Sequence, residues 1–570
     1  MTRLFRAPAP FSRPPLARAP RPRPSSARPS SARPSSARPS SPRPSSPRPA
    51  SLLAAMATLA GALGAPLAAS AEGTLTAFTS GYRSLNPGVQ SGAATGVPGS
   101  QIFAGLVLIG ADYGAEPYLA TGWEVSEDGL TYTFRLVEGA TFHDGAPITS
   151  ADVAFSLDVV KANHPFGPAM FGKVETVETP DDLTAVFKLS EPAPGLLLSL
   201  QPLLMPILPR HVYGDGQEVK KHPRNMTDVV GSGPFKVEEN NPAEKLILVK
   251  NEDFFIEGRP KLDRIVFPLV KDGLTRMLMV EKGEIDYAPF SGAKPTDAER
   301  LEEAGGVTVS KDGYGAVGYI HYLEMNLRDG PFADVKVRQA LAMALDTGFV
   351  ARVLFGGRAE VGTGPLHTGN PFYTADVPRL EPDMEKAAAM LDEAGYPAGS
   401  GGARFGFTLD VPSWALQSHG PMAEYIRAQL GKLGVSVELR RAPDFGTWVS
   451  RISSFDYEAT LNGSFNYPDP VIGVHRHFDC DNIRNVIWSN TQGYCDPAMD
   501  ALLDAAAVEQ DFDVRKGIYA EIQQKAVADQ VFIWMPEEFT TTILGARVEG
   551  APDGAFGPLA PWDEMTVSAE

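Results

Sequence analysis

Residues 117–156 read PYLATGWEVSEDGLTYTFRLVEGATFHDGAPITSADVAFS. Within this stretch, residues 131–136 (TYTFRL) alternate polar and apolar side chains, which is the period of a strand with one buried face. Turn signals stand on both sides of it, at residues 128–129 (DG) and 143–145 (HDG). The pattern therefore predicts a strand bounded by two tight turns.

A helix is expected directly after the second turn. Thr149 or Ser150 can cap its first turn, and the helix would run through Val153 and Phe155. Asp152 stands where the helix macrodipole favours an anion. The whole stretch then reads as strand, turn and capped helix, with no catalytic residue in it.

This order of residues resembles the signature of the dipeptide-, oligopeptide- and nickel-binding class of extracellular solute-binding proteins, family 5, which are the receptors of ABC importers. Similar stretches follow at residues 230–236 (VGSGPFK), 334–346 (DVKVRQALAMALD) and 382–397. Together they cover almost all of the chain after residue 72. The resemblance implies an α/β fold of the large, two-lobed class C periplasmic binding proteins, with a hinge between the lobes.

The first 71 residues differ in kind from the rest. They carry eleven Arg, no Lys and no acidic residue, and the unit ARPSS repeats from Ala27 to Pro39. Such a composition builds no packed core. An apolar run over residues 52–69 ends in Ala69-Ser70-Ala71, which fits the cleavage site of a secretory signal peptide. The alternative, a membrane anchor, is weaker because glycines and a proline interrupt the run.

Removal of the leader makes the chain strongly acidic. The 51 basic residues fall to 51 − 11 = 40 against 69 acidic ones, a net charge of −29. This charge argues against nucleic acid and anionic lipid as partners. The predicted cleavage site is followed directly by Glu72 and not by the cysteine that a lipoprotein anchor requires, so we expect no lipid anchor and a free periplasmic protein.

The chain has two cysteines, Cys480 and Cys495, with 14 residues between them. In an exported protein this pair indicates one disulfide, and some peptide receptors of the family carry a similar bridge. The alternative is a metal site that includes His475, His477 or Asp479, although no paired C-x-x-C motif supports it. We expect the disulfide and no metal.

The part after the leader is too long for one hydrophobic core, so two or more lobes are expected. Strand-like runs such as residues 246–249 alternate with helical ones such as residues 422–433, where Met422, Ile426, Leu430 and Leu433 fall at core spacing. The resemblance implies a first lobe of residues 72–266 and 537–570 and a second lobe of residues 267–536.

Catalytic motifs are weak throughout. Residues 313–318 match G-x-G-x-x-G, but an extended segment follows instead of the helix that would receive a pyrophosphate. His143 beside Asp144 is read as a turn histidine rather than an acid–base residue. We therefore expect no enzyme activity and no cofactor.

The ligand site is expected at residues 463–470 (GSFNYPDP). In peptide receptors of this class a similar segment holds an aspartate that pairs with the α-ammonium of the ligand, and a tryptophan three residues earlier. Here Asn466 and Gly463 stand at those positions, and an amide cannot neutralise a charge. The segment 411–421 also lacks the arginine that some dipeptide receptors use for the ligand carboxylate. Asp469 before Pro470 is expected to begin a helix rather than touch the ligand.

These departures favour a solute without a compact zwitterion: a longer or blocked peptide, a glycoside, an opine-like conjugate or a metal chelate. Apolar walls with polar tips and directional hydrogen bonds are what such a pocket needs. The residues expected to supply them are Ser464, Phe465, Asn466, Tyr467, Trp414 and His419. Trp414 is equally well read as a core residue, and Trp123 and Trp534 are read as core.

The sequence thus predicts a monomeric periplasmic receptor that holds a small organic solute between two lobes and delivers it to an ABC permease in the inner membrane. The alternative is a chemosensory or chaperone-like module that presents its ligand to another partner. Docking surfaces carry no readable motif, so the residues do not separate the two.

Overall fold

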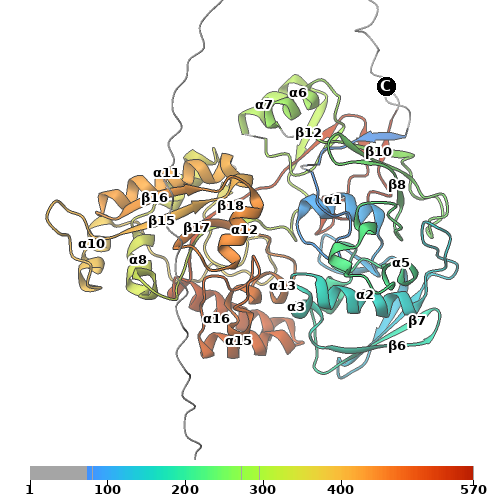
Figure 1. Cartoon of the computed structure of the whole chain (residues 1–570), viewed down its shortest axis with the longest axis horizontal. Helices are drawn as coiled ribbons and strands as arrows, with labels where there is room; N and C mark the ends of the chain where they lie inside the picture. Colours follow the sequence, from blue (N-terminus) through green and yellow to red (C-terminus); the bar gives the residue numbers. More distant parts are fainter. Residues whose placement is uncertain (1–72, 80, 271, 294, 358, 569–570) are drawn as a thin grey trace, which may run out of the picture. The chain divides into compact units, whose positions relative to one another are not determined.

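A computed structural model describes residues 73–568 of the chain except residues 80, 271, 294 and 358. The leader and signal peptide predicted for residues 1–71 lie outside these described residues. The described strands form six sheets, which fall into two groups along the chain (Figure 1).

The opening strand, turn and helix are confirmed. Strand β5 (Thr131–Leu136) buries every second side chain against the core. Helix α2 (Ser150–Asn163) begins after Thr149, whose backbone N and Oγ1 donate to Asp152 Oδ2 at 3.0 and 2.8 Å. This reciprocal cap satisfies backbone donors that the first turn leaves without a partner.

The first group of sheets surrounds the largest hydrophobic core. Its strands pair in the orders β1-β10-β9-β8, β4-β5-β7-β6, β2-β3, β11-β19-β12 and β20-β21. The other strands are β1 (Thr74–Thr76), β2 (Val107–Ile109), β3 (Ala115–Pro117), β4 (Ala120–Val125), β6 (Val174–Asp181), β7 (Thr184–Leu189), β8 (Phe235–Asn241), β9 (Lys245–Lys250), β10 (Arg264–Pro268), β11 (Tyr287–Ala288), β12 (Val307–Ser310), β19 (Thr542–Gly545), β20 (Val548–Glu549) and β21 (Thr566–Val567).

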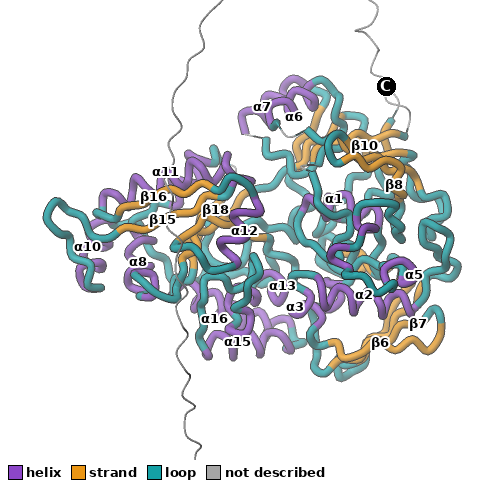
Figure 2. Tube along the Cα trace, viewed as in Figure 1, coloured by secondary structure: helices purple, strands orange, loops and turns teal. Residues whose placement is uncertain are grey.

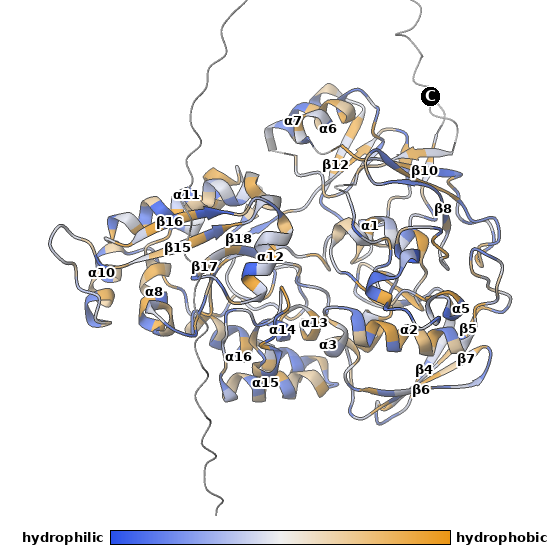
Figure 3. Ribbon diagram, in the orientation of Figure 1, coloured by the Kyte–Doolittle hydropathy of each residue, from blue (hydrophilic) through white to orange (hydrophobic). Residues whose placement is uncertain are grey.

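Helices of this group cover the sheets and connect their strands. They are α1 (Ala93–Ile102), α3 (Gly167–Phe171), α4 (Leu196–Ser199), α5 (Arg210–Tyr213), α6 (Gly273–Glu281) and α7 (Pro295–Ala304). In Figure 3, α2 carries both apolar and polar residues, as expected of a helix with one buried face.

The second group is one six-stranded sheet of order β14-β18-β13-β17-β15-β16. Its pairing is parallel between β15 and both of its neighbours and antiparallel elsewhere. The strands are β13 (Ile320–Met325), β14 (Ala359–Glu360), β15 (Gly406–Val411), β16 (Ser436–Arg441), β17 (Ala459–Ser464) and β18 (Phe532–Glu538). Figure 2 shows β15 and β16 beside helix α11, which packs on both strands.

Two helical layers cover this sheet. Side chains of α8, α10 and α11 share a core with Leu323, Leu409 and Leu461, whereas α15 and α16 share another with Tyr322 and Phe532. The helices of this half are α8 (Val335–Met343), α9 (Thr347–Phe349), α10 (Met384–Glu393), α11 (Leu416–Lys432), α12 (Phe445–Ser453), α13 (Pro470–Gly473), α14 (His475–Phe478), α15 (Pro497–Val508) and α16 (Phe512–Ala528).

Most of the predicted elements are confirmed. The helical core stripe of Met422, Ile426, Leu430 and Leu433 is buried on α11. The glycine motif at 313–318 leads into strand β13 and not into a helix. Trp534 is buried as expected, whereas Trp123 is only half-buried against its core.

Strand pairing moves between the two groups twice. The chain leaves the first group after β12, which ends at Ser310, and returns to it at β19, which begins at Thr542. The lobe boundaries expected at residues 266 and 537 stay a prediction. Pairing of β11 and β12 with β19 favours a first crossing later in the chain than residue 266.

The predicted disulfide between Cys480 and Cys495 is present. It excludes both thiolates from metal binding, although their sulfurs lie close to the carboxylate of Asp500. None of the helices in the described ranges combines the length and the apolar character that a bilayer span requires.

Candidate functional site

The predicted ligand segment begins at the end of strand β17. Ser464 is the last residue of that strand and pairs with Ile320 of β13. A Cβ atom at Gly463 would lie 2.3 Å from the hydroxyl oxygen of Tyr319, so a larger residue there would require Tyr319 to move. The ring of Tyr319 thus fills space beside the position where the resemblance expects a tryptophan.

Asn466 is 4% exposed and holds a neighbouring loop. Its Oδ1 accepts from the backbone N of His367 at 3.0 Å, and its Nδ2 donates to the carbonyl of Pro365 at 2.7 Å. These two contacts use one of the two lone pairs of Oδ1 and one of the two protons of Nδ2. In this structure the side chain of Asn466 positions residues 365–367.

Aromatic side chains of other segments contact Phe465 and Tyr467. The half-buried ring of Phe465 stacks near Phe290 at 6.3 Å and meets Tyr319 edge-on at 5.9 Å. Tyr467 is buried against Phe166, with ring centroids 5.6 Å apart. Burial raises the pKa of Tyr467 to about 12, so its hydroxyl stays protonated at neutral pH.

Tyr467 also adopts a left-handed backbone, with φ of +56°. This conformation costs a side chain with a Cβ atom roughly 1 kcal/mol, so the surrounding structure must enforce it. The strain marks the turn between strand β17 and helix α13.

Asp469 confirms the structural role expected for it. Its Oδ1 accepts from the backbone N of Val471 at 2.9 Å and so caps α13. Both carboxylate oxygens accept from the guanidinium of Arg515 at 2.8 Å, and the two side chains are almost fully buried. The Asp469–Arg515 ion pair stabilises the turn before α13, and both oxygens of Asp469 are already bound within the protein.

His419 lies in a chain of buried polar contacts. Its Nε2 is 2.9 Å from Nδ1 of His321, whose Nε2 is 3.0 Å from Oε2 of Glu538. Burial lowers the pKa of His419 well below its usual value, so its imidazole is neutral. It is connected to the 464–467 segment through His321 and Tyr319, whose rings are 4.7 Å apart.

A second group of ionisable residues near the loop held by Asn466 was not expected from the sequence. The side chain of Glu537 is fully buried, and its Oε2 accepts from Thr368 N at 3.0 Å and Thr368 Oγ1 at 2.9 Å. Burial raises the pKa of Glu537 to about 7, although the two Thr368 donors oppose the shift. His367 Nε2 lies 3.6 Å from the same carboxylate, and burial lowers the pKa of His367 to about 4.

One signal could have identified this group. Two adjacent carboxylates, Glu537 and Glu538, end the apolar run FIWMP of strand β18, and acidic residues at the end of a buried strand need partners. Trp414 lies in the short turn Ser413–Ala415, but its side chain is outside the part of the chain that the structure describes. Its predicted role stays a prediction, as do the ligand contacts of the other five residues.

Arg476 supplies a buried positive charge beside the segment. Its guanidinium donates to the carbonyls of Phe465, Gly473 and Trp488 at 2.9 to 3.2 Å and lies 4.4 Å from the ring centre of Phe166. Within the described residues, no carboxylate lies within ion-pair distance of it. The guanidinium of Arg476 and the ring of Phe166 therefore stabilise each other. The sequence pattern HRH at residues 475–477 did not predict this contact.

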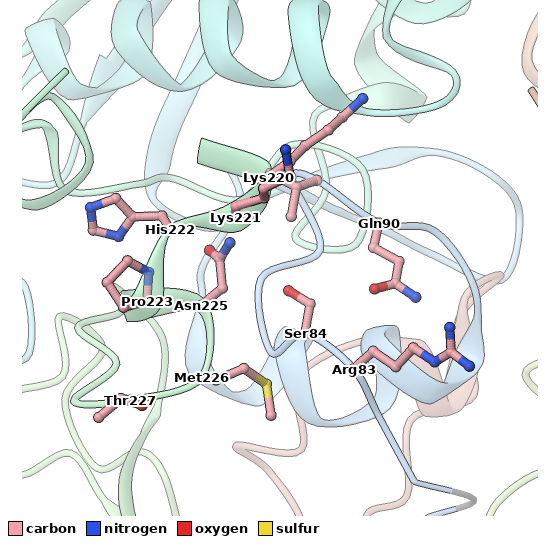
Figure 4. Close-up of a pocket in the computed structure, with 11 residues that line it drawn as sticks. Arg83, Ser84, Gln90, Lys220, Lys221, His222, Pro223, Asn225, Met226 and Thr227 are labelled. Atoms are coloured by element: carbon pink, nitrogen blue, oxygen red, sulfur yellow. The ribbon is translucent and has the colours of Figure 1, made fainter. Parts of the chain in front are cut away.

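A cavity of about 470 Å³ lies apart from the six predicted residues (Figure 4). Two segments line it, residues 83–90 and residues 220–227, and they are joined where Asn86 Nδ2 donates to Asn225 Oδ1 at 3.0 Å. Arg83, Lys220 and Lys221 contribute three positive charges, and none of the lining residues is acidic. This cavity lies in the first group of sheets.

Comparison with known proteins places these features in a family. The family of bacterial extracellular solute-binding proteins, family 5 (middle region), matches residues 114–485. A glutathione-binding protein GsiB of Pectobacterium atrosepticum is 27% identical over 85% of this chain and 93% of its own length.

Two solved structures share the fold. The periplasmic binding protein DppA of Helicobacter pylori, in complex with the peptide STSA, is 25% identical with a TM-score of 0.76, covering 87% of this chain and 98% of its own. The binding protein AgaA of A. tumefaciens R10, in complex with agropinic acid, is 26% identical with a TM-score of 0.74, covering 87% and 99%. The fold is therefore the two-lobed α/β fold of the periplasmic binding proteins, and the chain belongs to the bacterial extracellular solute-binding proteins of family 5.

Proposed function

We propose that this chain is the periplasmic receptor of an ABC importer and that it closes two lobes over a small organic solute, which it delivers to the permease. The family match over residues 114–485 carries this proposal. Export by the predicted signal peptide, and a free protein without a lipid anchor, are parts of the same proposal.

The chemistry of the candidate site supports a peptide-like or opine-like solute. Phe465 and Tyr467 offer apolar walls, and the contacts of Asn466 with the 365–367 loop use one of its two lone pairs and one of its two protons. The names of similar proteins refer to glutathione, a short peptide and agropinic acid. Asn466 offers no full charge to an α-ammonium, which favours longer or blocked peptides, glycosides, opine-like conjugates or chelates over dipeptides.

The hinge of this receptor is proposed at the two crossings between the groups of sheets, residues 311–319 and 539–541. Pairing of β12 and β19 before and after these residues supports this placement. Two crossing segments allow closure when a ligand prefers the closed form. A micromolar affinity corresponds to roughly −8 kcal/mol, which is enough to shift such an equilibrium.

Native mass spectrometry of the chain from residue 72, purified from a periplasm, tests the proposal directly. We expect a co-purifying small molecule, because such receptors retain ligands through purification when dissociation is slow. A thermal-shift screen of peptides, glycosides, opines and chelates follows if the protein is empty. A protein that carries no ligand and whose melting temperature no solute raises would contradict the proposal.

A further inference from the structure

The cavity between residues 83–90 and 220–227 is positive in an otherwise acidic protein. Beyond the leader the chain carries 40 basic and 69 acidic residues, yet the cavity has three cations and no carboxylate in its lining. A cavity lined by cations without carboxylates favours the binding of an anion, because the anion offsets the repulsion between the positive charges.

Two of the three cations lack a carboxylate partner. Lys221 pairs with Glu218 at 2.8 Å on the surface. Across the described ranges, no carboxylate forms an ion pair with Arg83 or Lys220. The carboxylate of Asp444 interacts electrostatically with Arg83. The oxygens of Asp444 already accept hydrogen bonds from the backbone N and Oγ1 of Thr447 at 2.8 and 2.9 Å.

Polar groups stand beside these cations. Figure 4 shows the side chains of Arg83 and Gln90 on the same side of the cavity, with Asn225 on the facing segment. Ser84 also lines the cavity, so hydroxyl and amide groups accompany the charges. Arginine with neighbouring donors is the arrangement that binds a carboxylate with directed hydrogen bonds.

Contacts connect this cavity to the candidate site. The guanidinium of Arg83 lies 5.8 Å from the ring centre of Phe445, the first residue of α12, and that ring is 6.2 Å from Trp488. The carbonyl of Trp488 accepts from Arg476, which also donates to the carbonyl of Phe465. Arg83 is therefore linked to Phe465 of the candidate site through Phe445, Trp488 and Arg476.

Lys220 and Arg476 also act on one common residue. His164 is buried, and its pKa falls to about 3 through burial and through the positive charges of Lys220 and Arg476. Both cations are thus within electrostatic reach of a single side chain.

We propose that the solute of this receptor carries a carboxylate and that Arg83 and Lys220 bind it in this cavity. The proposal rests on the proposed receptor function and names the class of its substrate. In this proposal the charged group of the solute is bound by residues of the first group of sheets. Asn466, in the second group, carries no charge and would bind the solute through hydrogen bonds alone.

The test compares matched acids and amides. The probes are N-acetylated tripeptides with a free C-terminal carboxylate, the same peptides as carboxamides, and glutathione. Binding to the chain from residue 72 is measured by calorimetry for the wild type, Arg83→Gln, Lys220→Gln and the double variant. Lys282→Gln is the control, since Lys282 is an exposed cation that does not line the cavity.

We expect acids to bind the wild type at least about tenfold more tightly than their amides, which is the value of one hydrogen bond to a charged group. The ratio should approach one in the double variant and stay at the wild-type value in Lys282→Gln. Equal binding of acids and amides by the wild type, or a ratio unchanged in the double variant, would overturn the carboxylate site and leave the receptor function standing.

The co-purifying ligand provides the second measurement. A retained molecule without a carboxylate overturns this inference while it supports the receptor. If the protein retains nothing and neither acids, amides nor any screened solute bind it, both the inference and the receptor function fail.

Discussion

The turn at Asp469 and the cavity at Arg83 both contain strong positive charge, but the two regions treat it differently. Arg515 is buried and makes two hydrogen bonds of 2.8 Å to one carboxylate. Arg83 is exposed, faces a cavity and has no carboxylate partner in the described part of the chain. In the first region the positive charge is neutralised by a buried carboxylate of the same chain. In the second region the positive charge can bind a ligand.

This difference separates structural charge from binding charge. Removing one partner of a buried pair leaves the other uncompensated, which is costly whatever the net value of the pair. A cation on the wall of an open cavity is solvated, so its loss should change binding and leave stability almost untouched.

The largest effect is expected from Arg515→Met. It leaves the carboxylate of Asp469 buried without its cation, so the free energy of unfolding should fall by about 3–5 kcal/mol in a denaturant titration. The double variant with Asp469→Asn, which keeps a capping oxygen but no charge, should recover most of that loss.

Lys525→Met serves as the matched control. Lys525 pairs with Asp496 and Asp529 but is partly exposed, so about 1 kcal/mol or less should be lost. An Arg515→Met protein as stable as this control would show that the buried pair does not hold the turn.

The pH dependence of stability sharpens the same comparison. His475 lies beside the pair, with its Nε2 2.9 Å from the hydroxyl of Tyr519, and burial lowers its pKa to about 3. Its folded pKa is below the unfolded value of 6.5, so the unfolded chain binds more protons between these values. Stability is therefore present above pH 6.5 and lost as pH falls, by about 2 kcal/mol at pH 5 for this residue.

His475→Gln removes the titrating group and keeps a neutral donor. Unfolding titrations at pH 7 and pH 5 should show a smaller loss in this variant than in the wild type. The other buried histidines titrate in both proteins, so the comparison isolates His475. An identical loss in the two proteins would mean that His475 does not stay neutral in the fold.

A smaller effect is expected at Asn466. Asn466→Ala removes both hydrogen bonds to the 365–367 loop and leaves buried backbone groups without partners, at a cost of about 1–2 kcal/mol. Hydrogen exchange at residues 365–368 should increase if the amide positions this loop. Unchanged exchange would assign Asn466 to ligand contact alone.

The smallest effect on stability is expected at Arg83 and Lys220, the two residues whose substitution is expected to weaken carboxylate binding. Arg83→Gln and Lys220→Gln should each change the free energy of unfolding by less than about 0.5 kcal/mol, since the substitutions remove no buried contact. A loss comparable to that of Asn466→Ala would make these cations structural and would remove the contrast between the two regions.

Local signals were sufficient for much of the fold. Strand β5, the cap of α2 by Thr149 and Asp152 and the buried stripe of α11 follow from spacing within ten or so residues, because backbone geometry alone dictates which side chains share a face. The disulfide was predictable for a different reason, since an exported chain with two cysteines has one possible pairing.

The candidate site was predictable as a segment but not as a set of contacts. Residues 463–470 were identified from resemblance, and the capping role of Asp469 from the proline that follows it. The partner of its carboxylate, Arg515, is 46 residues away. The partners of Asn466 are backbone atoms of another loop, and no periodicity in the sequence specifies such a pairing.

By itself the sequence determined the class of protein, the order of its elements, the acidic character of the chain and the absence of a charge at Asn466. Only the tertiary structure decided which charges neutralise one another. Ion pairs, buried carboxylates such as Glu537 and the cations around the Arg83 cavity depend on distances between residues far apart in the chain. Electrostatic energy depends on distance and burial, and both are properties of the folded chain rather than of its order of residues.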